Sequence, residues 1–400
     1  MGKALYLGVS GKARKGKKAY IGVSGKARKI KKIYIGDANG KARLGWSGMG
    51  KFLYQIVFNV TTSTGTSFPK NSLLSDDGLT WSKSSGERPQ NFQDIIFAKG
   101  KFWGVYCNYQ TAIIYSSVDG HTWTLVKAVK SSSYFGYNSI IRYENGVFIV
   151  HGEYSSSSNF MCYSTDGVNW TCVKYNGLHG SYTMSGAPLD IKYGTVNGVS
   201  GWYVLASDKS NVTMVYRFKT LSDLTSGTPE AFARTTVRSN RGILDLRNDT
   251  LYALFAYYTG TIENTSHTIL LYSYKTSWTQ LGRVTGQTIG SMWITDKTIA
   301  VRGVWWSDAQ MSWSVHYAQY NYVTGTFTSG TASWYGQTTR TKITAFVDGR
   351  MWQITDGRGA YSDDYGTTVT RFTPTTETLS SASTYEMLVY GDENYGYYRE

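Results

Sequence analysis

Short runs of apolar and β-branched residues, separated by glycine and polar turns, recur along most of the chain. One recurring unit is a tight turn followed at once by an apolar strand, as in Asn145-Gly146 before Val147-Phe148-Ile149. Glycine and asparagine adopt the positive φ that such hairpin turns need. Seven copies of this unit begin at Gly50, Gly100, Asn145, Gly201, Asn248, Asp296 and Asp348. The pattern predicts an all-β protein built from many short hairpins.

A second pattern, Ser-x-Asp-Gly-x-x-Trp, occurs three times between β-type runs, and its Asp residues lie 42 and 47 residues apart. The Ser and Asp side chains can bond nearby backbone amides, Gly closes the turn, and Trp starts the next strand. A repeat of about 40 to 50 residues that carries several strands is typical of a β-propeller blade. We therefore expect structural turns at Ser75, Asp77, Gly78, Trp81, Ser117, Asp119, Gly120, Trp123, Ser164, Asp166, Gly167 and Trp170.

Both patterns extend over residues 46–400 and predict one β-propeller domain of about seven blades, within a range of six to eight. The segment 386–397 looks like one further inner hairpin. It would complete the first or the last blade and so close the ring, which removes exposed sheet edges.

Residues 1–45 form a separate, basic segment with a 14-residue repeat, in which Tyr6, Tyr20 and Tyr34 are equivalent. Fourteen residues suffice for one hairpin or one coil of a small solenoid, and each unit has too few apolar residues for a core of its own. We therefore expect this short β-repeat arm to become ordered on a partner. Its contact residues would be Lys12, Arg14, Tyr20, Lys26, Arg28, Lys31, Lys32, Tyr34, Lys41 and Arg43.

The charge of the chain is concentrated in this arm. The whole chain carries a formal charge of +14, and residues 1–45 hold thirteen Lys or Arg against the single acid Asp37. A disordered basic tail and a nucleic-acid-binding arm are alternative interpretations. The strict phase of Tyr, Ile and Gly favours an ordered docking arm, and the chain shows no recognisable nucleic-acid module.

Other classes of site find little support in the sequence. The five His show no metal-ligand spacing, and neither a phosphate-binding glycine loop nor a nucleophile elbow occurs. We therefore expect no metal and no cofactor. We also expect no membrane insertion, because no apolar run reaches the roughly 18 residues of a membrane helix. Nor does an export signal follow the basic start. Cys162 and Cys172 flank the third turn motif and could face each other across a hairpin, but an odd, low count does not indicate a disulfide scaffold. All three cysteines, Cys107 included, are expected to be reduced in a cytoplasm.

The Ser-x-Asp-Gly-x-x-Trp motif resembles the Asp-box of sialidase-like and related BNR-repeat propellers, and the resemblance covers roughly residues 45–400. It implies that each box is a structural corner between the third and fourth strands of a blade, away from the ligand face. The repeat Lys-Ala-Arg-Lys-Ile-Lys-Lys-Ile-Tyr-Ile-Gly at 26–36 resembles repeats in tail-associated structural proteins of phages and prophages of Gram-positive bacteria. That second resemblance covers about a tenth of the chain.

The sialidase resemblance raises the question of catalysis. Sialidases need an arginine cluster for the substrate carboxylate, a Tyr nucleophile with its Glu, and an Asp acid/base. Their Arg-Ile-Pro signature is missing here, since no Pro follows an Ile. We expect the remaining charges to be scattered and solvated and the protein not to be an enzyme; those that could converge are Arg142, Arg217, Arg302, Arg350, Glu144, Glu153 and Glu263.

Aromatic side chains on polar loops are the remaining candidates for ligand binding, because their rings can stack on sugars. The alternative is that they fill space between blades. The candidates are Tyr134, Tyr137, Trp305, Trp306 and Trp313.

These features together predict a non-enzymatic phage virion protein, made in the bacterial host cytoplasm and present in several copies or as an oligomer. The arm would dock on other virion proteins, in the tail or baseplate rather than the head, and the propeller would bind a host-surface glycan. A particle-borne glycan-cleaving enzyme and a module for nucleic acid or anionic wall polymer are the alternatives.

Overall fold

The computed structural model shows an almost entirely β protein. It describes residues 6–9, 12–15, 19–23, 26–30, 32–36, 42–47, 53–59, 61–62, 65–66, 72–75, 82–83, 92, 94–108, 111–118, 122–130, 138–153, 160–174, 188–207, 212–238, 241–258, 267–294, 298–307, 312–332, 344–347, 350–355, 358–362, 368–373, 384–390 and 396–399. Side chains are described mainly between residues 92 and 330.

Most strands belong to four-stranded antiparallel units, and four of the sheets are each formed by four strands that follow one another in sequence. The first such sheet contains β12 (Asp94–Ala98), β13 (Lys101–Asn108), β14 (Thr111–Ser117) and β15 (Thr124–Lys130). The next contains β16 (Asn138–Glu144), β17 (Val147–Glu153), β18 (Phe160–Ser164) and β19 (Thr171–Lys174). Two more contain β20 (Asp190–Val196), β21 (Val199–Ser207), β22 (Val212–Phe218) and β23 (Ala231–Arg238), and β31 (Thr344–Val347), β32 (Arg350–Thr355), β33 (Arg358–Ser362) and β34 (Thr370–Phe372).

One long strand, β27 (Trp278–Ile294), belongs to two such units. Its first half pairs with β26 and its second half pairs with β28. The strands around it are β24 (Arg241–Arg247), β25 (Thr250–Tyr258), β26 (His267–Tyr274), β28 (Thr298–Ser307), β29 (Ser312–Asn321) and β30 (Thr326–Ala332).

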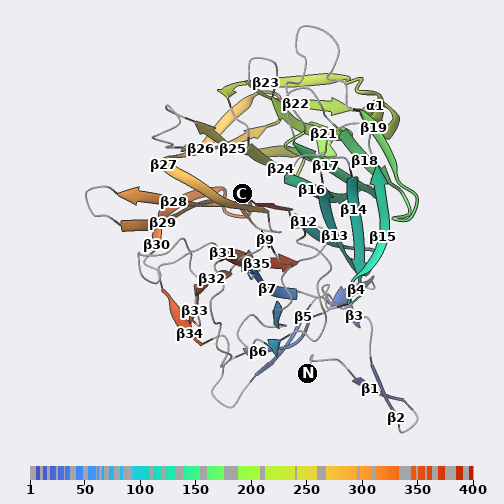
Figure 1. Ribbon diagram of the computed structural model, residues 1–400, viewed down its shortest axis with the longest axis vertical. Coiled ribbons are helices and arrows are strands. Elements are labelled where there is room, and N and C mark those ends of the chain that lie inside the picture. The colour runs from blue at the N-terminus through green and yellow to red at the C-terminus, as the bar shows by residue number, and fades with distance from the viewer. Residues whose placement is uncertain are drawn as a thin grey trace.

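The last unit joins the two ends of the propeller. Strand β35 (Thr384–Tyr390) pairs along its whole length with β7 (Leu53–Asn59). On its other side β7 pairs with β10 (Ser72–Ser75), which pairs in turn with β11 (Ser82–Lys83). The units follow one another around a ring, and β35 closes it (Figure 1). The predicted β-propeller fold and its closure by the C-terminal segment are thus confirmed. The described strands make seven four-stranded units, while the blade count of the ring stays a prediction.

The segment 386–397 does not form a hairpin, contrary to the sequence-based prediction. Its second strand, β36 (Gly396–Arg399), pairs with β27 instead of β35 and also lies against β16 and β24. The two C-terminal strands pair with edges of different units, β35 with β7 and β36 with β27, and therefore do not pair with each other. The C-terminal end of the chain therefore lies near the centre of the ring (Figure 1).

The core lies between neighbouring sheets. One cluster joins Ile149 and Met161 of one unit to Trp202, Val204 and Tyr216 of the next, and all five are nearly or completely buried. Large aromatic residues suit this position, since the wide gap between splayed sheets needs bulky side chains.

Tight turns connect the first and second strands of successive units, as the sequence predicted at Asn145-Gly146. The turn predicted at Gly201 lies earlier, at Asn197-Gly198, because Gly201 pairs with Gly194 inside β21. Asn145, Gly146, Asn197 and Gly198 all have positive φ, which suits a two-residue hairpin turn. The turns between third and fourth strands lie at the same edge of the ring, because the strands are antiparallel. We call this edge the turn edge.

The unit formed by β20–β23 has a short helix, α1 (Leu221–Ser226), between its third and fourth strands. Thr220 and Asp223 form a capping box at its start, and Gly227 ends it with φ of 71°. Within the described part of the chain, no helix has the length and apolar character needed to span a membrane.

The basic arm consists of three separate antiparallel hairpins among the described strands. They are β1 (Tyr6–Val9) with β2 (Lys12–Lys15), β3 (Ala19–Val23) with β4 (Lys26–Ile30), and β5 (Lys32–Gly36) with β6 (Ala42–Ser47). Another small hairpin follows, β8 (Thr61–Thr62) with β9 (Gly65–Thr66). The 14-residue repeat therefore corresponds to one hairpin, and its third copy reaches Ser47, two residues beyond the predicted boundary.

A disulfide joins Cys162 of β18 to Cys172 of β19. The two residues lie directly opposite each other in the ladder, with Cα atoms 4.0 Å apart. The prediction of reduced thiols is wrong for this pair, since antiparallel pairing brings the two side chains together. Cys107 is buried and belongs to no disulfide.

Candidate functional site

The third turn motif shows what its Asp does. The Asp166 carboxylate accepts hydrogen bonds from the Ser164 hydroxyl, the Val168 and Asn169 amides and the Asn169 side chain, all at 2.8–2.9 Å. The backbone amide of Asn169 contributes most to a pKa well below the usual range for Asp166. Every one of these bonds is local, so this Asp stabilises the turn, as the motif predicted.

The Gly and Trp of this motif dock the turn on the neighbouring unit. Gly167 has φ of +80°, and a Cβ there would lie 2.5 Å from the Trp103 ring. The Trp170 indole donates to the Gly167 carbonyl at 3.1 Å and its ring lies 6.0 Å from that of Phe148. Lys99 of the preceding unit donates to the Thr165 carbonyl at 2.8 Å. Glycine is therefore required here for both its φ and its lack of a side chain.

The other two motif copies are described in part. Ser75 ends β10, Ser117 is buried at the end of β14, and Trp123 packs on Phe92 with ring centroids 4.5 Å apart. The structural role of these residues stays a prediction. Asp77, Gly78, Trp81, Asp119 and Gly120 lie outside the described residues.

The arm residues fall at equivalent positions in the three hairpins. Lys12, Arg14, Tyr20, Lys26, Arg28, Lys32, Tyr34 and Arg43 lie in strands, and Lys31 and Lys41 lie outside the described residues. In register, Leu7 is opposite Arg14, Ile21 opposite Arg28, and Ile35 opposite Arg43. The repeat thus places one apolar residue opposite one arginine in every hairpin.

The three tryptophan candidates fall at the edge of the ring opposite the turn edge. Trp306 lies opposite Trp313 in the β28–β29 ladder, and Trp305 is next to them. The three tryptophans therefore occupy one hairpin end, and their role in ligand binding stays a prediction. Tyr134 and Tyr137 lie outside the described residues.

A network of buried charges joins the innermost strands of consecutive units. The Arg142 guanidinium of β16 pairs with Asp94 of β12 at 3.1 Å and with Asp190 of β20 at 2.9 Å. Asp94 also accepts from the Ile141 amide at 3.0 Å, and Asp190 from the Leu244 amide of β24 at 2.9 Å. Each carboxylate therefore links its own strand to the next one, and the network spans four units.

The environment changes the pKa values in this network. Burial raises the pKa of Asp94 to about 6, although Arg142 and two backbone amides act in the opposite direction. Burial opposes the charge on Arg142 as well, but Asp190 and Asp94 outweigh it and raise its pKa. Burial followed by the charge of Arg142 lowers the pKa of His151 to about 4. His151 is thus neutral near pH 7, and its ring makes no hydrogen bond of good geometry in the described structure.

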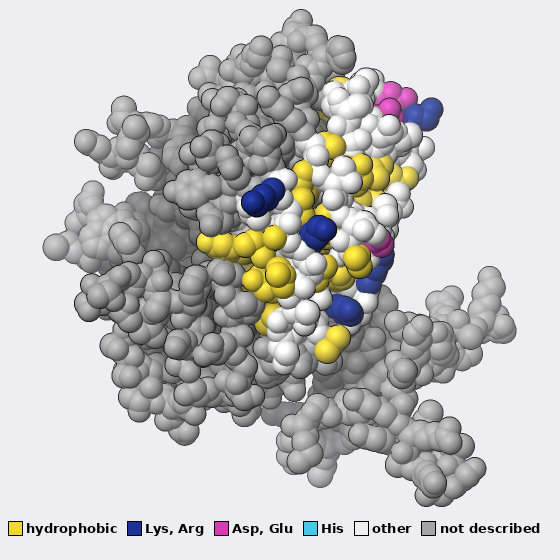
Figure 2. Space-filling view, turned by 45° about the vertical axis from the view of Figure 1, so that its right-hand side comes forward, with side chains coloured by type: hydrophobic (Ala, Val, Ile, Leu, Met, Phe, Trp, Pro, Cys, Tyr) yellow, Lys and Arg dark blue, Asp and Glu magenta, His cyan; other side chains and the backbone are white. Residues whose placement is uncertain are grey.

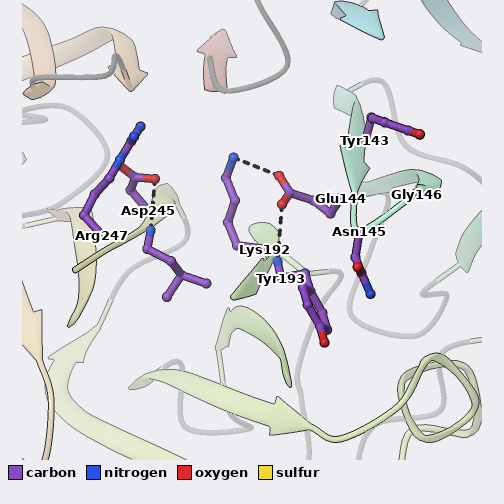
Figure 3. Close-up of a pocket in the computed structure, with 9 residues that line it drawn as sticks. Tyr143, Glu144, Asn145, Gly146, Lys192, Tyr193, Asp245 and Arg247 are labelled. Carbon is purple, nitrogen blue, oxygen red and sulfur yellow. Dashed lines mark hydrogen bonds and ion pairs between the residues drawn. The ribbon is translucent and has the colours of Figure 1, made fainter. Parts of the chain in front are cut away.

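A cavity of about 450 Å³ opens near the turn edge, between the innermost strands β16, β20 and β24. We call it the charge-paired pocket. Its lining residues are Tyr143, Glu144, Asn145, Gly146, Lys192, Tyr193, Asp245, Leu246 and Arg247. Figure 3 shows Lys192 lying between Glu144 and Asp245.

Two ion pairs line the charge-paired pocket. The Lys192 ammonium lies 2.9 Å from the Glu144 carboxylate, and the Arg247 guanidinium lies 2.7 Å from Asp245. Burial raises the pKa of Glu144 despite Lys192, while Glu144, Asp190 and Asp245 together outweigh burial and raise the pKa of Lys192. The second Glu144 oxygen accepts from the Tyr193 amide at 3.3 Å.

These inner-strand charges were not recognised as a site in the sequence. Arg142 and Glu144 were expected to be solvated, but Arg142 is 2% exposed and the Glu144 side chain is 13% exposed. That expectation was wrong because it treated both residues as loop residues. A signal was present, since Asp94, Arg142 and Asp190 occur at intervals of 48 residues, each beside apolar residues of a strand.

The arginines discussed for sialidase chemistry do not form a cluster within the described residues. Arg217 lies on β22 and pairs with Glu230 at 3.1 Å, whereas Arg142 lies on an innermost strand. The described residues contain no group of three or more His, Cys, Asp or Glu arranged to hold a metal ion.

No known protein-family model matches the sequence, and no curated protein matches it either. Solved structures resemble it in fold. A protein from Lactobacillus plantarum is 14% identical, with a TM-score of 0.49, over 85% of this chain and 100% of that one. The β-propeller domain of the Trilobed protease from Pyrococcus furiosus is 7% identical, with a TM-score of 0.41, over 74% and 91%. An exo-1,5-alpha-L-arabinanase from a bovine ruminal metagenomic library is 10% identical, with a TM-score of 0.38, over 59% and 95%.

Proposed function

We propose that this protein is a non-enzymatic accessory protein of a phage particle. The arm at residues 1–45 docks on other virion proteins, and the propeller is displayed to bind a host-surface glycan. The observation that carries the proposal is the arm itself: three hairpins that each place one apolar residue opposite one arginine, in a segment that holds thirteen of the 41 Lys and Arg of the chain.

The arm suits docking for a physical reason. An isolated two-stranded hairpin is marginally stable in water, so each of the three gains stability from a partner surface. The repeated pairing of Leu7, Ile21 or Ile35 with an arginine offers the same contact three times. Three linked weak contacts bind far more tightly than one. On the face shown in Figure 2, by contrast, the described Lys and Arg of the propeller are scattered among uncharged and a few acidic side chains.

The carboxylates of the inner-strand network are placed for a structural role and not for catalysis. A general acid or base must reach its substrate. Asp94 and Asp190 are at most 5% exposed, and each accepts bonds from backbone amides and Arg142. Such carboxylates hold neighbouring units together instead of contacting a ligand.

Deleting residues 1–45 is expected to abolish incorporation into particles while leaving a soluble, folded propeller. The hairpins supply the contacts with the particle, whereas the sheets of the propeller pair among themselves. Mass spectrometry and immunogold electron microscopy of purified particles, with circular dichroism of the truncated protein, measure both results. Incorporation of the truncated protein would contradict the docking role.

A salt series distinguishes the arm's partner. Binding through phosphates weakens steeply as ionic strength rises. Docking through paired strands and apolar residues is expected to persist in 0.5 M salt. At that ionic strength charges are screened beyond a few ångström, so an arm held by charge alone would dissociate. If the full chain instead leaves the particles at low salt and is recovered bound to RNA or DNA, the arm is a polyanion-binding module.

A glycan-cleaving enzyme is the second candidate function. It is favoured by Glu144, a buried carboxyl of raised pKa that lines the same cavity as Asp245. Two carboxyl groups at one cavity are the arrangement that glycoside hydrolysis requires. Release of reducing sugar from host-wall polysaccharide by the full chain, lost in Glu144→Gln, would establish this function; we expect no release, because Lys192 and the Tyr193 amide already occupy Glu144.

A further inference from the structure

The charge-paired pocket has the features of a ligand-binding site, apart from any catalytic role of Glu144 and Asp245. Its volume of about 450 Å³ falls within the range of roughly 300–1,000 Å³ that small-molecule sites occupy. It is formed by three separate inner strands, and none of the aromatic candidates from the sequence lines it. Gly194 lets β20 approach β24 here, since a Cβ at that position would lie 2.8 Å from Leu246. The close approach of these two strands helps to define the cavity.

The charges in the pocket cancel. Lys192 pairs with Glu144 and Arg247 pairs with Asp245, so the lining holds two cations and two anions. A ligand with a net charge would break one pair or leave its own charge uncompensated next to nearly buried groups, which is costly. The lining therefore favours a ligand without net charge.

The same groups require a ligand that both donates and accepts hydrogen bonds. An ammonium and a guanidinium only donate, whereas ionised carboxylates only accept. Each carboxylate oxygen has more than one lone pair, so Glu144 and Asp245 can accept further bonds beyond their present partners. A hydroxyl group both donates and accepts, and neighbouring hydroxyls on one ring can meet donors and acceptors that lie side by side.

We propose that the charge-paired pocket binds one neutral, hydroxyl-rich sugar residue at the turn edge of the propeller. This inference rests on the proposed glycan-binding function and names its site and ligand class. It differs from the expectation taken from sialidase-like propellers, which places the ligand away from the Asp-box turns and provides arginines for an acidic sugar. Here the pocket lies near those turns, at the same edge as Asn145 and Gly146.

The test measures binding of single sugars to the full chain. The probes are the methyl glycosides of glucose, galactose and N-acetylglucosamine, compared with glucuronic acid and N-acetylneuraminic acid. Saturation-transfer NMR detects binding and isothermal titration calorimetry gives Kd. We expect at least one neutral glycoside to bind and both acidic sugars to bind more weakly.

Two variants locate the site. Glu144→Gln combined with Lys192→Met removes one ion pair as a unit, so that no charge is left buried alone. Asp245→Asn keeps the shape of the second acid and removes its charge. Each variant is expected to raise the Kd of the neutral glycoside by about 10- to 100-fold, the loss that follows when hydrogen bonds to charged groups are removed.

A matched control lies outside the pocket. Arg217→Met combined with Glu230→Gln removes the 3.1 Å ion pair between Arg217 of β22 and Glu230, and is expected to leave Kd unchanged. Thermal unfolding of all variants confirms that they are folded, and Asp245→Asn suffices if the double variant is not. The inference is overturned if no neutral glycoside binds, if an acidic sugar binds more tightly, or if neither pocket variant weakens binding relative to the control.

The result is independent of the particle experiments. Sugar binding at the pocket by a protein absent from virions would reject only the virion role. Presence in virions without pocket binding would reject only this inference.

Discussion

Replacing Arg142 with methionine is expected to lower the free energy of unfolding by about 3–5 kcal/mol. The change leaves Asp94 and Asp190 without their shared cation, and the side chains of both acids are at most 5% exposed. Breaking a buried ion pair by removing one partner costs far more than breaking a pair in water, because the remaining charge stays in a poorly solvated site. Urea unfolding followed by tryptophan fluorescence measures the loss.

Two controls make this result specific. Lys275→Met removes one partner of an exposed ion pair, Lys275 with Asp249 at 3.7 Å, and is expected to cost less than about 1 kcal/mol. Combining Arg142→Met with Asp94→Asn and Asp190→Asn is expected to recover part of the loss, since the Asn side-chain oxygens can still accept from the Ile141 and Leu244 backbone N–H groups. If Arg142→Met costs no more than Lys275→Met, the network does not hold the units together.

Removing residues 384–400 is expected to abolish folding of the soluble propeller. This truncation deletes β35, so the inner edge of β7 loses its partner and the ring has no closing strand. An unpaired edge next to an exposed core favours aggregation. Size-exclusion chromatography and limited proteolysis of the truncated chain measure the effect.

A shorter truncation serves as its comparison. Removing residues 392–400 deletes β36 alone and keeps the β35–β7 ladder. This chain is expected to stay soluble and monodisperse, with a smaller loss of thermal stability. Equal behaviour of the two truncated chains would show that β35 does not close the ring.

The propeller and the arm contribute to the proposed function in different ways. The network and the closing strand keep the propeller rigid, and a rigid scaffold presents its pocket without an ordering cost on binding. The arm acts separately, because its hairpins pair only within themselves among the described strands. Loss of the arm and loss of the pocket are therefore expected to be separable in one set of variants.

The sequence by itself determined the local structure. Turn chemistry at Asn145-Gly146 and at 164–170 specifies hairpins, because only certain residues adopt positive φ or bond nearby amides. The spacing of the motifs indicated the propeller. The 14-residue repeat was compatible with one hairpin or one solenoid coil per copy, and the structure has the hairpin. These features depend on neighbours in the chain, so the pattern of residues is sufficient to predict them.

The tertiary structure alone decided which charges meet. Asp94, Arg142 and Asp190 lie 48 residues apart in turn, and only the ring arrangement of the units brings them within 3.1 Å. The fate of β36 and the charge-paired pocket depend in the same way on the positions of strands from separate units. A sequence lists charged residues but does not fix their burial or their partners, since burial and pairing arise from packing between distant segments.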